Sequence, residues 1–309
     1  MSKIAFVFPG QGSQNVGMGK DLYDNFKEAK ELYEKACDIL DLDLIKLCFE
    51  GPIEELTKTE IAQPAILTTS IAANILLEKN GINMDAAAGH SLGEYSAYVA
   101  AGYLSFEDGL KAVRERGLAM AGADPEGKGG MAAIIGLETD VVKEICEQAS
   151  KKGVVVPANF NTPNQIVISG EKSGIAEAIK LADEKEATMA KELVVSGAFH
   201  SPLMESALDK FRGVIDALDI KQGKCPVVAN VSADAVQLSG IKDSLIKQMT
   251  SSVLWVDSVN KMVEMGVETF IEVGSGKVLR GLIKKVNRKL EVFSAGDSSS
   301  LEKTLEKLK

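Results

Sequence analysis

The chain has 309 residues, 45% of them hydrophobic and 26% charged, which is ordinary for a globular protein with enough apolar side chains to build a large core. Its formal net charge of −9 at pH 7 argues against a nucleic-acid-binding protein, because an acidic surface repels phosphates. The four cysteines have no metal-ligand or redox spacing, so we expect reduced thiols and a cytoplasmic protein.

The first predicted element is a buried strand over 3–8, Lys-Ile-Ala-Phe-Val-Phe, which a Pro-Gly pair ends. This apolar run is too short for a signal segment or a membrane span, so we expect no membrane association. The loop after it lacks the third glycine of a dinucleotide-binding fingerprint, which excludes that interpretation. Gln11 stands between two glycines there and could present a side-chain amide and a backbone N–H together, although a plain polar turn residue fits as well.

The periodicity next predicts an amphipathic helix over 21–40, a shorter one over 41–50 and an apolar helix over 64–79. Small residues then lead into Gly-His-Ser-Leu-Gly over 89–93, the pattern of a strand that turns sharply into a helix and holds a serine hydroxyl at the turn. Gly89 and Gly93 avoid a collision as strand and helix close together. Ser91 would lie in the field of a helix N-terminus, and the Leu92 N–H would face a developing oxyanion. A turn of small residues without chemistry has the same pattern.

A further helix is predicted to begin at Ser105, which can cap it, and to carry Arg114 and Arg116 on opposite sides of its buried stripe. Either arginine could lean into a pocket, and a solvated arginine is the commoner case.

After a Gly- and Pro-containing linker over 122–130 the pattern changes to strand 131–137, helix 140–152, strands 153–158 and 165–169, helix 173–185 and strand 188–195. This βαββαβ order is typical of a ferredoxin-like unit. The rest reads as strand 224–231, helices 241–250 and 255–265, strand 267–273 and helix 277–289. We therefore predict an α/β fold, with an α/β-hydrolase-like main domain over 1–126 and 197–309. Its parallel sheet carries the nucleophile elbow, and a smaller ferredoxin-like domain is inserted over 127–196.

A serine nucleophile needs a base, and the chain has only two histidines. His90 is the neighbour of Ser91, and adjacent side chains diverge at such a turn. His200 remains as the candidate base, on a loop just before a helix that Ser201 can cap.

Several segments together resemble the signature segments of malonyl-CoA:acyl carrier protein transacylases, a family related to the acyltransferase domains of fatty-acid and polyketide synthases. They are Phe-Pro-Gly-Gln-Gly-Ser-Gln at 8–14, Gly-His-Ser-Leu-Gly-Glu-Tyr-Ser-Ala at 89–97, Arg-Gly at 116–117, Gly-Ala-Phe-His-Ser at 197–201 and Glu-Val-Gly-Ser-Gly-Lys at 272–277. The resemblance runs from residue 4 to about residue 285, and Ser275 stands where proline is common in the family.

The resemblance implies a dyad of Ser91 and His200, with the imidazole oriented by the backbone carbonyl of Gln248 rather than by a carboxylate. It implies an oxyanion hole formed by the backbone N–H groups of Leu92 and Gln11. It also implies that Arg116 pairs with the malonyl carboxylate and that Phe199 closes the pocket around the acyl group. A planar guanidinium suits that pairing, since it offers two parallel donors to a carboxylate.

The activity so implied is ping-pong transfer of malonyl from malonyl-CoA to the phosphopantetheine thiol of acyl carrier protein, which supplies fatty-acid biosynthesis. Malonyl-CoA and acyl carrier protein are the expected partners of a monomer, and no metal or redox cofactor is needed. Two alternatives stay open: an α/β-hydrolase esterase with an additional acid, and a non-catalytic scaffold that binds acyl carrier protein. An acidic carrier needs a local basic surface, and the helix predicted over 277–289 offers Lys277, Arg280, Lys284 and Arg288.

Overall fold

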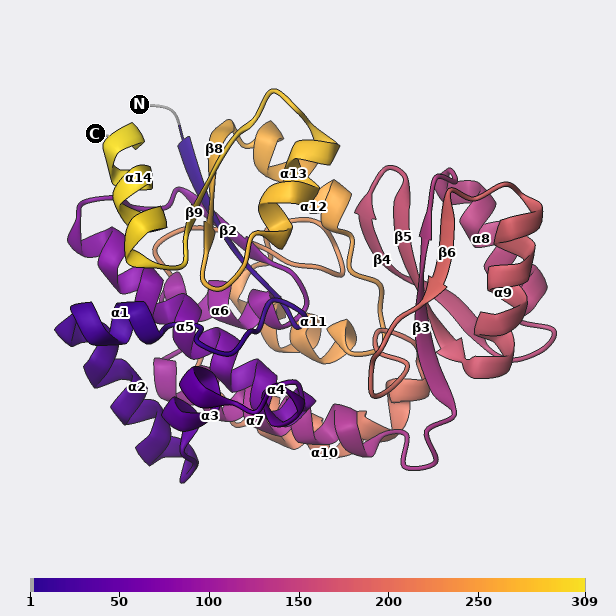
Figure 1. The fold of residues 1–309 in the computed structure, drawn as a ribbon, viewed down its shortest axis with the longest axis horizontal. Helices are drawn as coiled ribbons and strands as arrows, with labels where there is room; N and C mark the ends of the chain where they lie inside the picture. The colour runs from indigo at the N-terminus through magenta and orange to yellow at the C-terminus, as the bar shows by residue number, and fades with distance from the viewer. Residues whose placement is uncertain (1–2, 309) are drawn as a thin grey trace.

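The structure, a computed structural model, describes residues 3–308 and contains two sheets (Figure 1). Residues 1, 2 and 309, which belong to the predicted main domain, lie outside the described part. The parallel sheet has the order β7-β2-β1-β8-β9, formed by β1 (Lys3–Phe8), β2 (Ala86–Gly89), β7 (Val227–Val228), β8 (Val267–Val273) and β9 (Glu291–Ala295). The antiparallel sheet has the order β4-β5-β3-β6, formed by β3 (Gly129–Ile135), β4 (Val155–Thr162), β5 (Gln165–Glu171) and β6 (Met189–Glu192). The predicted α/β class with a separate smaller sheet is confirmed.

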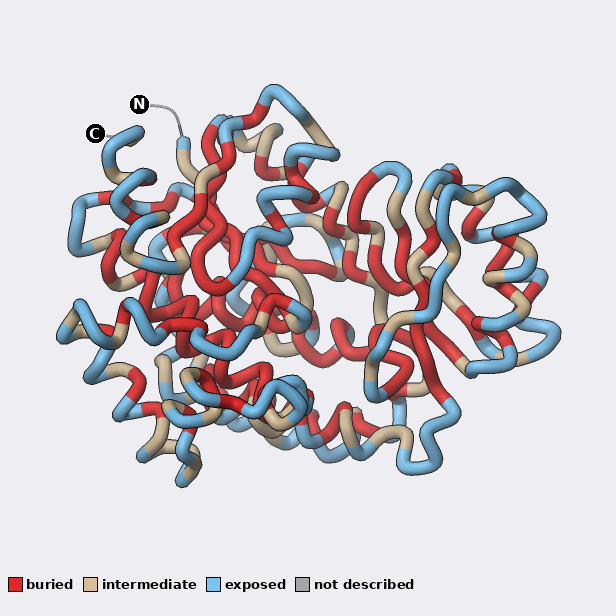
Figure 2. The backbone as a smooth tube through the Cα atoms, in the orientation of Figure 1, coloured by how far each residue is buried: buried red, intermediate tan, exposed pale blue. Residues whose placement is uncertain are grey.

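Strand β1 lies in the middle of the parallel sheet and is buried on both faces (Figure 2). Its side chains alternate, so Phe6 and Phe8 enter one apolar cluster while Ala5 and Val7 enter the other. In the parallel register Phe8 pairs with Gly89 of β2. The loops that leave these two strands therefore start side by side at the carboxyl edge of the sheet, where ligand sites of α/β folds are found.

Helices cover both faces of this sheet. The cluster on one face includes α2 (Lys27–Leu40), α3 (Leu44–Glu50), α4 (Ile53–Leu56), α5 (Thr59–Lys79), α6 (Leu92–Ala100), α7 (Phe106–Gly122), α10 (Glu205–Asp216), α11 (Ile241–Gln248) and α14 (Ser298–Leu308). The other face is covered by α12 (Trp255–Glu264) and α13 (Val278–Val286). This two-sided cover explains why the central strands read as continuous apolar runs.

Helix α5 is the one described helix that is long and apolar enough to cross a membrane, but 89% of its most apolar window is buried inside the fold. It begins at Thr59, five residues before the predicted start, and so contains Pro64. Proline has no N–H to offer the carbonyl of Glu60 one turn earlier. The Arg114 side chain from α7 donates to that carbonyl at 2.6 Å instead, so a partner from another helix compensates for the proline.

The smaller lobe consists of the antiparallel sheet with α8 (Thr139–Ala149) and α9 (Lys172–Glu184), in the chain order β3-α8-β4-β5-α9-β6 (Figure 1, right). The two helices pack on the sheet around a separate apolar cluster. The lobe is joined to the rest of the fold by backbone hydrogen bonds of Val253, which donates to the Ala158 carbonyl at 2.8 Å and accepts from the Phe160 N–H at 2.9 Å.

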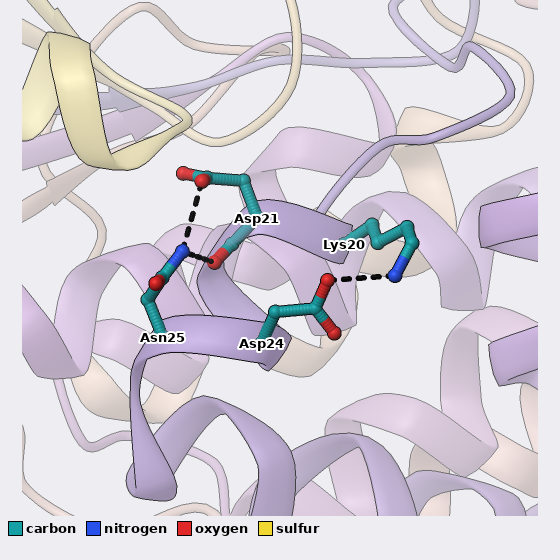
Figure 3. A network of polar contacts seen from close by, with 4 residues as sticks. All are labelled: Lys20, Asp21, Asp24 and Asn25. Carbon is teal, nitrogen blue, oxygen red and sulfur yellow. Dashed lines mark hydrogen bonds and ion pairs between the residues drawn. The ribbon is translucent and has the colours of Figure 1, made fainter.

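The single helix predicted over 21–40 is wrong, because α1 (Lys20–Asn25) ends before α2 begins. The Asn25 amide donates to the Asp21 carbonyl at 2.8 Å and to the Asp21 carboxylate at 3.0 Å (Figure 3). A side chain that occupies a carbonyl in this way competes with the helix backbone. Phe26 then adopts an extended conformation with φ −131°, and Lys20 pairs with Asp24 on the exposed side.

The C-terminal part also differs from prediction in two boundaries and two further elements. The strand predicted over 224–231 reduces to the two residues of β7, because the chain turns back at Ala229, whose N–H donates to the Asp234 carbonyl. Helix α13 stops at Val286, since Asn287 is extended, so Arg288 lies beyond the helix. The edge strand β9 and the terminal helix α14 were not predicted.

Candidate active site

Ser91 occupies the turn between β2 and α6 with φ 51° and ψ −106°, an uncommon backbone conformation for a residue other than glycine. A Cβ on Gly89 would collide with the backbone of Gly93, and a Cβ on Gly93 would collide with the Phe8 carbonyl. The two glycines thus allow strand, helix and neighbouring loop to meet. The Ser91 side chain lies at the start of α6, where the helix dipole favours negative charge.

His200 lies on the loop between β6 and the short helix η1 (Pro202–Met204), which Ser201 caps through its side chain. Its Nε2 atom is 2.7 Å from Ser91 Oγ. Its Nδ1 atom faces two backbone carbonyls, that of Gln248 at 2.9 Å and that of Ser251 at 3.2 Å. Carbonyls only accept, so Nδ1 carries the proton and Nε2 is left to accept from the serine hydroxyl.

The electrostatics of the site keep this imidazole neutral. Burial first, and then the nearby positive charge of Arg116, lower the pKa of His200 to about 3. A neutral ring at neutral pH can take a proton from Ser91.

Arg116 is buried, with 1% of its surface exposed, and projects from α7 toward Ser91. Its Nη2 donates to Ser91 Oγ at 3.1 Å and to the Gln248 side-chain oxygen at 2.9 Å, and its Nη1 donates to the Gln63 side chain at 3.0 Å. The guanidinium also lies over the Tyr95 ring, 5.5 Å from its centre. Burial lowers the pKa of Arg116. Of the two arginines that the sequence left open, only this one reaches the serine.

Leu92 and Gln11 come from the start of α6 and from the loop after β1. Leu92 is the first residue of α6, where backbone N–H groups have no helical acceptor. Gln11 follows Gly10. A Cβ on Gly10 would collide with the His90 carbonyl, so this loop lies directly against the elbow. The Gln11 amide nitrogen donates to the Thr59 hydroxyl at 3.2 Å.

A cavity of about 300 Å³ opens above these groups. Its lining includes every candidate except Gln248, namely Ser91, His200, Arg116, Gln11, Leu92 and Phe199. Phe199 is 7% exposed and lies beside the base. The smaller lobe contributes Asn161, whose side-chain oxygen accepts from His90 Nε2 at 2.8 Å. The His90 side chain is thus bound to the lobe. Within residues 3–308, no group of three or more His, Cys, Asp and Glu side chains could hold a metal ion.

The site also contains buried polar residues that the sequence analysis missed: Asn230, Gln63, Glu94 and the Gln248 side chain. The Asn230 side chain accepts from the Ser91 N–H at 2.7 Å and donates to the Gly89 carbonyl at 2.7 Å. Nothing in the local pattern around Asn230 distinguishes it from a turn residue. Glu94 could have been noticed, because it is an acid within an otherwise small and apolar stretch. An acid near a helix N-terminus is, however, equally explained by the helix dipole.

A serine hydroxyl held at a strand-to-helix turn beside a neutral imidazole is the arrangement of enzymes that pass acyl groups through a serine ester. Residues 5–298 match the acyl transferase domain family, and the chain belongs to this family of acyltransferases. It is 50% identical, over 100% of its length and 98% of the relative's, to the malonyl CoA-acyl carrier protein transacylase of Bacillus subtilis strain 168.

Solved structures agree with this assignment. The acyl-carrier-protein S-malonyltransferase of Burkholderia pseudomallei 1710b superimposes with a TM-score of 0.96 at 44% identity, over 98% of this chain and 99% of that one. A malonyl-transacylase in complex with its type II PKS acyl-carrier protein superimposes with a TM-score of 0.96 at 38% identity, over 99% and 100% of the two chains.

Proposed function

We propose that this acyltransferase moves the malonyl group from malonyl-CoA to the phosphopantetheine thiol of acyl carrier protein and so supplies fatty-acid biosynthesis. The observation that carries the proposal is the 2.7 Å contact between Ser91 Oγ and His200 Nε2 at the base of a cavity that also contains a buried arginine. The full-length similarity to proteins named as malonyl CoA-acyl carrier protein transacylases supports the choice of donor and acceptor.

In the first half-reaction His200 Nε2 takes the hydroxyl proton as Ser91 Oγ attacks the thioester carbonyl. The oxyanion that forms is stabilised by the backbone N–H groups of Leu92 and Gln11. When the C–S bond breaks, the leaving CoA thiolate receives the proton from His200, and a malonyl ester remains on Ser91.

In the second half-reaction the carrier thiol gives its proton to His200 and its sulfur attacks the ester. The C–O bond to Ser91 breaks, and the serine oxygen takes the proton back from the imidazole. Each step moves a proton and an acyl group only, so the chemistry requires no metal and no redox cofactor; CoA enters as part of the substrate. All of these groups come from one chain, and we propose that the protein acts as a monomer.

Arg116 is the proposed binding residue for the malonyl carboxylate. A carboxylate that leaves water needs a charged partner, since an unpaired buried charge is costly. The guanidinium lies 3.1 Å from the nucleophilic oxygen, close enough for its donors to reach a carboxylate on an acyl group bonded there.

We propose a finer description of the fold as well: an α/β-hydrolase-like main domain over 1–126 and 197–309 and a ferredoxin-like insert over 127–196. The βαββαβ order and the strand order β4-β5-β3-β6 support the ferredoxin-like insert. The strand–Ser91–helix turn in a parallel sheet supports the α/β-hydrolase-like main domain.

The test is intact mass spectrometry after mixing the protein with malonyl-CoA, followed by addition of the phosphopantetheine-bearing carrier protein. We expect a malonyl adduct on Ser91 that disappears as malonyl-carrier forms. An esterase would release free malonate and leave the carrier unmodified. A non-catalytic scaffold would bind the carrier and form no adduct. The two backbone carbonyls at His200 Nδ1, where an esterase triad has an acid, favour transfer over the esterase alternative.

A further inference from the structure

Glu94 is a buried acid that the proposed mechanism does not use. It lies three residues after Ser91 on α6 and is 0% exposed. One carboxylate oxygen accepts from the Asn230 backbone N–H at 2.9 Å and from the Gln248 amide nitrogen at 2.8 Å, while the other oxygen is buried without a hydrogen-bond partner among the described residues. Burial raises its pKa to about 7. Burial of a carboxyl group with one unpartnered oxygen lowers the stability of the fold, which suggests that Glu94 has a role beside the nucleophile.

The two partners of Glu94 hold the nucleophile. The Asn230 side chain accepts from the Ser91 N–H at 2.7 Å, and the Gln248 amide nitrogen donates to the Ser91 carbonyl at 3.0 Å. Both peptide groups of the strained serine are therefore held by side chains of residues that Glu94 binds, Asn230 through its backbone N–H and Gln248 through its side-chain amide. Strained backbone conformations persist only where the surroundings enforce them.

Gln248 extends the same network to the other two reacting groups. Its side-chain oxygen accepts from Arg116 Nη2 at 2.9 Å, and its backbone carbonyl accepts from His200 Nδ1 at 2.9 Å. The amide has donors at one end and an acceptor at the other. Arg116 can only donate and the Glu94 carboxylate can only accept, so together they allow one orientation of the Gln248 amide. Ser91, His200 and Arg116 are thus each connected to Glu94 through hydrogen bonds of a single intervening residue.

We propose that Glu94 is a positioning residue for acyl transfer: its acceptor oxygen locks Asn230 and Gln248, and through them the Ser91 backbone, the Arg116 guanidinium and the carbonyl that orients His200. The inference rests on the proposed function and adds to it a residue that touches none of the reacting atoms.

Three substitutions distinguish a role for Glu94 as a hydrogen-bond acceptor from a role for its charge. Glu94→Gln keeps an oxygen that can accept from both partners and removes the charge. Glu94→Asp keeps the charge and withdraws the oxygens by one methylene. Glu94→Ala removes both. The readout is the rate of malonyl adduct formation on Ser91 at a series of malonyl-CoA concentrations, measured by rapid quench and intact mass and divided by the folded fraction from near-UV circular dichroism.

We expect the maximal acylation rate to fall by about tenfold or more in Glu94→Ala and Glu94→Asp and to stay within about threefold of the wild-type rate in Glu94→Gln, with the half-saturating malonyl-CoA concentration changed less than the maximal rate. Glu272→Ala is the matched control. Glu272 is also 0% exposed and accepts from the Leu279 and Arg280 N–H groups at the start of α13, away from this network. That variant should lose stability and keep its acylation rate per folded molecule.

A folded Glu94→Ala that acylates at the wild-type rate overturns the inference, as does an equal loss in Glu272→Ala. A Glu94→Gln as slow as Glu94→Ala, with a normal Glu94→Asp, overturns it in favour of a role for the charge. If Glu94→Ala does not fold, the order of the Gln and Asp variants decides alone. Failure of the proposed function itself looks different, because the wild-type protein would then form no malonyl adduct.

Discussion

Ser91 and His200 stand 109 positions apart in the chain, yet Ser91 Oγ and His200 Nε2 lie 2.7 Å from each other and both residues have positive φ, 51° and 59°. Non-glycine residues in such conformations cost on the order of 1–3 kcal/mol each. The contact therefore depends on groups that enforce it from outside, above all the side chains of Asn230 and Gln248 at Ser91 and the Gln248 backbone carbonyl at His200.

The dyad gives the first prediction. Ser91→Ala should abolish the malonyl adduct, and His200→Ala should slow adduct formation by roughly 10²–10⁴-fold, the usual worth of a general base. The measurement is the adduct rate by intact mass, per folded molecule. If folded His200→Ala turned over at a near-normal rate, the imidazole would be a structural group only.

Arg116→Ala should change which acyl groups are accepted. Truncating one member of a buried charged pair typically costs roughly 2–5 kcal/mol, and about 1.4 kcal/mol corresponds to tenfold, so malonyl transfer should fall by more than an order of magnitude. Acetyl-CoA should fare relatively better, because the site no longer requires a charge. The comparison is kcat/KM for the two donors.

Arg114→Ala is the internal control for Arg116, on the same helix two residues away. Its guanidinium donates to the Glu60 carbonyl and not to the serine, so its loss should lower the melting temperature and leave the malonyl-to-acetyl preference unchanged. Equal losses for both donors in Arg116→Ala would mean that another residue binds the carboxylate.

Phe199 should limit branching at the acyl α-carbon, since its ring is buried beside the base and lines the cavity. Phe199→Ser should raise the rate with methylmalonyl-CoA relative to malonyl-CoA, because it removes ring volume next to the reacting ester. Competition between the two donors, read by mass of the adduct, measures this. An unchanged ratio would make Phe199 a packing residue.

His200 should not titrate near neutral pH. Its folded pKa of about 3 lies below the ordinary value of 6.5, so the unfolded chain binds a proton between these values that the folded chain does not. The stability contributed by the neutral ring is full above about pH 6.5 and is lost as the pH falls toward 3. With two histidines in the chain, the ring C2–H signals can be followed by NMR and assigned with His200→Ala. A His200 midpoint near 6.5 contradicts the prediction, and Arg116→Ala should move the midpoint upward.

Carrier docking should depend on the basic residues on α13 and directly before and after it. Lys277, Arg280, Lys284 and Arg288 are exposed, and Val278, Leu279 and Leu282 of the same helix line the cavity. Charge reversal at Lys284 and Arg288 should raise the KM for carrier protein and leave the KM for malonyl-CoA unchanged. Equal effects on both substrates would remove this surface as the docking site.

Local patterns in the sequence were sufficient for the elbow and for most elements. The glycines at 89 and 93 predict a close approach of backbone, and the structure places the Gly93 backbone against Gly89 and the Phe8 carbonyl against Gly93. The scarcity of histidine singled out His200, and the structure brings it to Ser91; the roles of these residues remain predictions. The helix period alone could not separate Arg114 from Arg116, and only the family resemblance pointed to Arg116, because their difference depends on where α5 packs against α7.

The buried polar network was beyond sequence reasoning for the same reason. Asn230, Gln248 and Glu94 come from three distant segments, and each fits a turn, a helix end or a helix start by itself. Only the packed fold brings their donors and acceptors together. The break between α1 and α2 was missed because the apolar period continues through it, although Phe26 is extended and the Asn25 side chain binds Asp21.

The backbone pairing of Val253 with β4 bears on attempts to exchange the smaller lobe between relatives. Residues 248–253 supply both carbonyls that orient His200, and the same segment is bound to Ala158 and Phe160, with the Ser252 hydroxyl donating to the Pro157 carbonyl at 2.7 Å. A chimera joined only at the linkers would pair β4 of another protein with residues 248–253, the segment that orients the His200 imidazole. Grafts intended to alter acyl choice should therefore carry 248–253 with the lobe, because these two stretches, remote in the gene, form one structural unit.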